Sequence, residues 1–215
     1  MRKCFISFVF LNIISSFFLI SQASAIGFGG YVTGGYTGNH WTYEEGELDL
    51  EESDNSEMLK YGVGFILDTA VAKDSLFNYR LNVGYCRTEM ASDKLPDVKG
   101  NDFHLYNTFG FGLLRTEGFR FWVGPQFGFG LMLGKHEPLS TNKQCNALYG
   151  SLGAVAGINI HTGDLLSIGI DGGYRYNLNT GYSDVAYAGS NFTGSGHEAF
   201  ACISFIFRIN DNFTN

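Results

Sequence analysis

The segment between Phe119 and Leu133 carries an apolar side chain at every second position. These positions are Phe119, Phe121, Val123, Pro125, Phe127, Phe129, Leu131 and Leu133. The positions between them are small or polar, apart from Trp122 and Met132. Successive side chains of a strand point to opposite faces, so this pattern predicts a strand with one apolar face. The segment exceeds the roughly 5–6 residues of an ordinary strand. It also covers the roughly 9–11 residues that a tilted strand needs to cross a bilayer, so we predict a transmembrane β-strand.

The first residues have the pattern of a secretory signal peptide. Arg2 and Lys3 form a basic region, residues 5–20 are mostly apolar, and Ala23-Ser24-Ala25 resembles a cleavage site. An uncleaved anchor helix is the alternative, but the apolar run is short for a membrane span. We therefore expect a signal peptide over residues 1–25 and a barrel domain over residues 26–215.

The charge of the mature chain excludes some partners. Without Arg2 and Lys3, 12 basic residues face 21 acidic residues, which gives a net charge of −9. This charge argues against nucleic acid as a partner. The mature chain also lacks a long continuous apolar run. Insertion into a membrane would therefore require alternating strands closed into a barrel, because open sheet edges cannot face lipid.

Eight segments of the mature chain show the alternation of a strand. They cover residues 26–36, 60–69, 77–87, 102–114, 119–133, 147–160, 165–176 and 197–209. We expect four long loops at residues 40–58, 90–100, 135–146 and 177–196, which alternate with short turns. This asymmetry predicts an all-β, eight-stranded, antiparallel up-and-down transmembrane barrel. It also predicts periplasmic turns, external loops and two periplasmic mature termini in a bacterial outer membrane.

Aromatic residues fall near both ends of the expected strands. One group comprises Tyr36, Tyr61, Tyr85, Phe103, Tyr174 and Tyr176, and the other comprises Phe77, Tyr79, Phe119 and Phe207. Two aromatic girdles are expected at the two membrane interfaces. A soluble eight-stranded barrel with its apolar face inward is the strongest rival. Its outer face would be rich in charged residues, whereas the second face here is mostly Gly, Ser, Thr and Asn.

Pro125 interrupts the pattern of its strand. Proline has no amide hydrogen to donate to a ladder, and a closed barrel has no free edge where it could be tolerated. We therefore predict a bulge or a local break in the ladder near Gly124 and Pro125.

The chain resembles the small eight-stranded outer-membrane β-barrel superfamily, which includes the opacity-type, OmpX-type and OmpA transmembrane-domain proteins. The segment 122–128, Trp-Val-Gly-Pro-Gln-Phe-Gly, is similar to a strand motif of porin-family members. The segment 200–209 resembles the last-strand signal that the barrel-insertion machinery reads, although the chain continues to Asn215. The resemblance implies outer-membrane lipid, periplasmic chaperones and the insertion machinery as partners.

The expected inner face holds a set of ionisable residues. They are Asp68, Arg80, His104, Arg120, Asp171, Arg175, Glu198 and Arg208. They could form a selectivity constriction, but eight strands leave an interior that side chains just fill. We favour a salt-bridged plug.

Two further groups of residues are candidate sites. The expected acidic external loop carries Glu44, Glu45, Glu47, Asp49, Glu51, Glu52, Asp54 and Glu57 and no Lys or Arg. It lacks the spacing of a calcium loop, so a solvated charge run is favoured. Ser195, His197 and Glu198 could serve a lipid-modifying enzyme, but nothing else converges on them.

The remaining features leave function open between three classes. Cys86, Cys145 and Cys202 are an odd number after cleavage, so three pairings are possible for one bond and the sequence does not select among them. We expect no cofactor, metal or catalytic residue. The favoured function is a non-enzymatic envelope protein with surface-exposed loops for envelope integrity, adhesion or a host ligand. The alternatives are a narrow channel for small, possibly hydrophobic solutes, as in OmpW-like relatives, and a lipid-modifying enzyme.

Overall fold

The computed structural model describes residues 26–45, 50–69, 76–137, 143–163, 165–185 and 190–209. Eight strands form the fold: β1 (Gly27–Glu45), β2 (Leu50–Asp68), β3 (Phe77–Ser92), β4 (Val98–Arg115), β5 (Phe119–His136), β6 (Gln144–Thr162), β7 (Leu166–Ser183) and β8 (Ser190–Arg208). Within these ranges no helix is long and apolar enough to cross a membrane.

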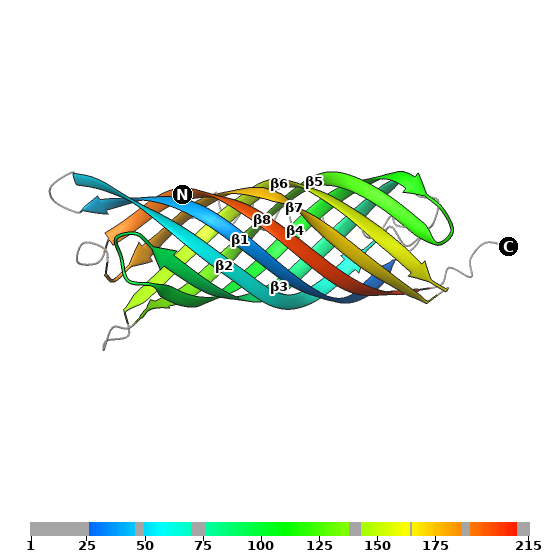
Figure 1. Ribbon diagram of the computed structural model, residues 1–215, viewed down its shortest axis with the longest axis horizontal. Coiled ribbons are helices and arrows are strands. Elements are labelled where there is room, and N and C mark those ends of the chain that lie inside the picture. The colour runs from blue at the N-terminus through cyan, green and yellow to red at the C-terminus, as the bar shows by residue number, and fades with distance from the viewer. Residues whose placement is uncertain are drawn as a thin grey trace.

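The strands close into one antiparallel barrel in chain order. Each strand pairs with its sequence neighbours, and β1 closes the ring on β8 through pairs such as Gly27 with Arg208. Figure 1 shows that β1 starts and β8 ends at the same end of the cylinder. We call this the turn end, because the β2–β3, β4–β5 and β6–β7 connections also lie there. The opposite end, with the other four connections, is the loop end. The predicted fold class is confirmed.

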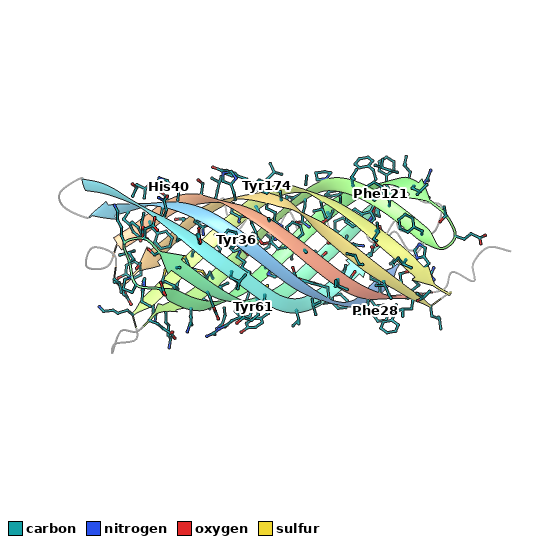
Figure 2. All side chains as sticks on the ribbon, in the orientation of Figure 1. Phe28, Tyr36, His40, Tyr61, Phe121 and Tyr174 are labelled. Atoms are coloured by element: carbon teal, nitrogen blue, oxygen red, sulfur yellow. The ribbon has the colours of Figure 1, made fainter. Side chains whose placement is uncertain are left out.

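A belt of exposed apolar side chains surrounds the barrel. It includes Phe28, Val32, Tyr36, Tyr61, Val63, Phe65, Phe77, Val83, Tyr85, Phe103, Phe111, Leu131, Leu152, Ile160, Ile170, Tyr174, Tyr176, Ile203, Phe205 and Phe207. In Figure 2, Tyr36, Tyr61 and Tyr174 lie at one level and Phe28 and Phe121 lie near the turn end. Such an apolar band with aromatic borders is typical of a transmembrane barrel and would be unstable in water.

The strands are longer at the loop end than the sequence predicted. β1 and β2 remain paired out to Glu45 and Leu50, although residues 40–58 were expected to form a loop. The same correction applies to residues 90–100, 135–146 and 177–196, most of which continue the neighbouring strands. The expected alternation of long loops and short turns was therefore wrong. The barrel instead extends beyond its apolar belt, and it does so at the loop end.

In this extension the two faces of the wall exchange polarity. Outward positions on β1 change from Val32 and Tyr36 in the belt to His40 and Thr42, while inward positions change from Thr37 and Asn39 to Trp41 and Tyr43. The inward residues form one buried apolar cluster, which we call the loop-end cap: Trp41, Tyr43, Met58, Met90, Val98, Met132, Cys145, Ala147 and Phe192. Because the outer face now meets water, an apolar interior is the favourable arrangement.

The predicted ladder break at Pro125 is confirmed. β4 and β5 pair up to Thr108 with Gln126 and resume at Phe111 with Val123, so Phe109 and Gly110 have no ladder partner on β5. On its other side Pro125 stays in register with Ala154 of β6. The missing amide of proline thus interrupts one ladder and leaves the other intact. A bulge follows between Gly112 and Leu114.

Asn107 lies on the apolar outer face but is covered. The Tyr79 hydroxyl donates a hydrogen bond to the Asn107 side-chain oxygen at 2.5 Å, and the Tyr79 ring packs against Phe109. Both side chains are therefore buried, at 5% and 1% exposure. Tyr79 was predicted to belong to an exposed aromatic girdle. It instead shields a polar group from hydrocarbon, which lowers the cost of placing an amide in the belt.

Candidate functional site: the filled lumen

The lumen near the turn end is organised around Arg80 on β3. Its guanidinium donates to Asp68 at 2.7 Å and to Asp171 at 2.6 Å, and it donates to the side-chain oxygen of Asn159 at 3.0 Å. It also lies 4.5 Å from the centre of the Trp122 ring. Arg80 is 1% exposed. One buried cation therefore joins side chains from β2, β5, β6 and β7.

A second ion network lies closer to the loop end. The Lys60 ammonium is 3.7 Å from Asp102 and 3.6 Å from Glu198. Arg175 donates to Glu198 at 3.1 Å and to the Gln126 oxygen at 2.6 Å. The Arg175 guanidinium also stacks between the rings of two aromatic residues, Tyr106 and Phe200, at 3.7 and 3.5 Å from their centres. Paired charges with satisfied hydrogen bonds can remain ionised in a buried site.

His104 extends this network across the lumen. Its Nδ1 lies 2.9 Å from the Asp102 carboxylate, and its Nε2 lies 2.8 Å from the Tyr31 hydroxyl. Together with Cys86, these residues place possible metal ligands within 4.8 Å of one another. However, both imidazole nitrogens already have partners, and the Lys60 ammonium faces the same carboxylate. The group is therefore best described as a hydrogen-bond network.

Two arginines at the turn end bond to neutral oxygens. Arg120 donates to the backbone carbonyl of Leu76 at 3.5 Å and to the Asn78 side chain at 3.3 Å. Its Nε and Nη1 atoms have no hydrogen-bond partner within the described part of the chain. Arg208 donates to the backbone carbonyls of Gly163 and Leu166. These cations therefore line the turn-end opening of the barrel.

Little free space remains between the two networks. A cavity of about 20 Å³ is lined by Tyr31, Lys60, Asp102, Arg175 and Glu198, among others. This volume holds about one water molecule. Trp122 is fully buried on the turn-end side, and the loop-end cap closes the other side. The lumen is thus a packed polar core that ends in an apolar plug.

Comparison with known proteins supports the fold. The structure matches the outer membrane protein OprG from Pseudomonas aeruginosa with a TM-score of 0.56 and 9% identity, over 85% of this chain and 96% of that one. This chain has the fold of the small eight-stranded outer-membrane β-barrels. Weaker matches include the outer membrane protein AlkL, with a TM-score of 0.43 and 11% identity, over 87% of this chain and 93% of that one. Ail of Yersinia pestis, in complex with the heparin analogue sucrose octasulfate, matches with a TM-score of 0.36 and 13% identity, over 85% of this chain and 99% of that one. No protein-family model and no curated protein sequence matches the chain.

The structure places all the ionisable residues expected inside this outer-membrane barrel on its inner wall. It groups Asp68, Arg80 and Asp171 in one network, and Arg175, Glu198 and His104 in the other. Sequence reasoning missed Lys60 and Asp102, which join the second network. Both begin predicted strands, 60–69 and 102–114. Their position one residue from the outward Tyr61 and Phe103 was the signal that could have placed them inside.

The acidic residues expected in one external loop are distributed differently in the barrel. Glu47 and Asp49 lie outside the described residues, whereas Glu44, Glu45, Glu51 and Glu52 belong to β1 and β2. Asp54 is buried inside the barrel and accepts a hydrogen bond from Ser92, while Glu57 is exposed on the outer face. The expectation of one solvated loop was wrong because the hairpin continues the barrel wall.

Ser195, His197 and Glu198 do not converge. Glu198 is buried inside the barrel, whereas His197 lies on the outer face. Successive strand residues point to opposite sides, so a carboxylate next to a histidine in the sequence cannot orient it here. Cys86, Cys145 and Cys202 are buried free thiols.

Proposed function

We propose that this protein is a non-conducting, non-enzymatic outer-membrane barrel whose loop-end extension is displayed outside the cell. Its role would be envelope integrity, or adhesion to a surface or host ligand through the connections at that end. The observation that carries the proposal is the filled lumen, with its two buried ion networks and the apolar cap. A rigid, closed barrel can hold an extension above the membrane without opening a path through it.

The extension supports the proposed orientation. Outward side chains of β1, β2 and β8 at the loop end are polar, such as His40, Asn55 and Thr193, so this part of the barrel suits water and the belt suits lipid. Transmembrane barrels of bacteria carry their longer extensions on the external side. The loop end would therefore face outward, and the mature termini at the turn end would face the periplasm.

The closed lumen predicts a silent barrel in planar bilayers. We expect the folded mature protein to produce no defined conductance steps, because a cavity for one water cannot support a hydrated ion. The measurement is single-channel recording after reconstitution, with a porin as the positive control. Reproducible steps with the folded protein would contradict the proposal and favour the narrow-channel alternative.

The proposed orientation predicts which connections an antibody reaches on intact cells. An epitope that replaces residues 186–189, between β7 and β8, should be labelled without permeabilisation. The same epitope inserted after Glu117, between β4 and β5, should be labelled only after the outer membrane is opened. Flow cytometry measures both, and the reverse pattern would invert the topology.

A further inference from the structure

A hollow on the outer face of the extension lies over Gly38 of β1. Its volume is about 380 Å³, and it is lined by Gly38, Asn39, His40, Asn55, Ser56, Glu57, Asp93, Ser195 and His197. A Cβ atom added to Gly38 would meet no heavy atom within 4 Å. The hollow therefore exists because the strand has no side chain at this position. Figure 2 shows His40 beyond Tyr36 on the way to the loop end.

Three side chains with metal-binding atoms surround this glycine. Gly38 pairs with Glu57 on β2 and with His197 on β8, so these two residues flank it on opposite sides. His40 follows two positions along β1 and points to the same face. His40, Glu57 and His197 are all exposed. Strands lie about 4.8 Å apart, so rotation of these side chains can bring two imidazoles and a carboxylate together above Gly38.

Two of the three side chains are already oriented by hydrogen bonds. His40 Nδ1 lies 2.9 Å from the side-chain oxygen of Asn55, so it donates there and leaves Nε2 as a free electron-pair donor. The Tyr36 hydroxyl forms a side-chain hydrogen bond with Glu57. Histidines that bind metals commonly donate their other ring N–H to an oxygen, and carboxylate ligands are hydrogen-bonded in turn.

The third side chain packs toward β7 and must rotate to reach the hollow, whereas the local charge already favours a cation. The His197 ring lies 5.7 Å from the Tyr174 ring and 5.1 Å from the Tyr176 ring, measured between centroids. The residues that line the hollow include the carboxylates of Glu57 and Asp93 and no Lys or Arg. An anionic ligand such as phosphate would therefore be repelled, whereas a divalent cation would be attracted.

We infer that the hollow over Gly38 binds a divalent transition-metal ion of the zinc type through His40, His197 and Glu57. Imidazole nitrogen and carboxylate oxygen are ordinary ligands of Zn²⁺, and three protein ligands leave a fourth position open. The open position faces outward, where a water or a group from another molecule can occupy it. This site goes beyond the proposed role of the barrel and does not depend on whether the lumen conducts.

The test is zinc binding by the folded mature barrel in detergent micelles, measured by isothermal titration calorimetry. We expect one Zn²⁺ per barrel. His40→Ala and His197→Ala should each weaken binding at least tenfold, because each removes a ligand. Asn55→Leu should weaken it about tenfold, because it removes the hydrogen bond that orients His40. All three substitutions lie on the solvated surface and leave the barrel wall intact.

Gly38→Val provides a test that removes no ligand. The valine would fill the space that the ion needs, and a β-branched residue suits a strand. Its matched control is Gly34→Val, at an outward position in the belt where a Cβ also fits, 3.8 Å from the Lys60 carbonyl. Zinc binding should be lost in the first variant and unchanged in the second. His161→Ala, at the turn end, should also leave it unchanged. Absent binding, or binding that Gly38→Val does not weaken, would overturn the inference.

Discussion

Replacing Arg80 with alanine should lower the free energy of unfolding by about 3–5 kcal/mol. The guanidinium holds Asp68 and Asp171 at hydrogen-bond distance inside the barrel. Without it, two buried carboxylates lose the cation that they share, and their mutual repulsion is no longer offset by it. The ring of Trp122 also loses its stacked partner. The large effect therefore comes from two buried carboxylates that lose their shared cation.

Reversible urea titrations of the barrel in micelles would measure this change. Arg87→Ala is the matched control, because Arg87 lies on the same strand, is exposed and donates to Asn101 at 3.1 Å. Its loss should cost about 0–1 kcal/mol. If Arg80→Ala gives too little folded protein, Arg80→Lys keeps the charge and should fold with an intermediate loss. Similar costs for Arg80→Ala and Arg87→Ala would contradict the Arg80-centred network.

Replacing Phe127 with arginine should cost about 2–4 kcal/mol of folding free energy in lipid. Phe127 lies near the middle of β5 on the outer face, between Asn107 of β4 and Leu152 of β6. Its ring stacks on Phe109 at 5.6 Å. An arginine here would place a charge near the bilayer midplane, too far from either interface for full hydration.

Phe119→Arg is the control, since Phe119 begins β5 at the rim of the belt. The penalty near an interface is about 0–1 kcal/mol. Reversible folding titrations of both variants in liposomes would compare the two depths. Equal costs at Phe119 and Phe127, or no cost at Phe127, would mean that this face does not meet hydrocarbon. The soluble-barrel interpretation would then return.

The lipid-facing half of the structure was predictable because one physical rule governs it. Outward residues such as Phe65 and Phe127 contact hydrocarbon, so each must be apolar regardless of its neighbours. Pro125 was equally informative, because the missing amide hydrogen has the same effect in any ladder. Alternation and turn signals also gave the number of strands.

The loop-end cap was not predictable by the same rule. Trp41 and Met58 belong to strands whose apolar face has moved from outside to inside, so a search for outward apolar residues treats them as loop. Period-two alternation continues through these residues, but its phase is reversed relative to the belt. A reversal of phase, without a turn signal, was the available indication that the strand continues.

The partners of the inward charges required the register. Arg80 and Asp171 lie far apart in the sequence and on strands that do not pair. They meet because the barrel is narrow enough for side chains to cross the lumen. Alternation placed both of them inside, but only the stagger of all eight strands sets them at the same height.

The reversal of polarity along strands such as β1 and β8 sets the depth of the barrel in its membrane. In the proposed orientation, sinking toward the periplasm would draw His40 and Glu57 into hydrocarbon, and rising would expose Tyr36 and Tyr174 to water. Either displacement is opposed, because these strands carry a polar and an apolar outer surface at different heights. The outer surface of the barrel therefore determines its own depth in the membrane. The same face of the extension stays at the same distance above the lipid.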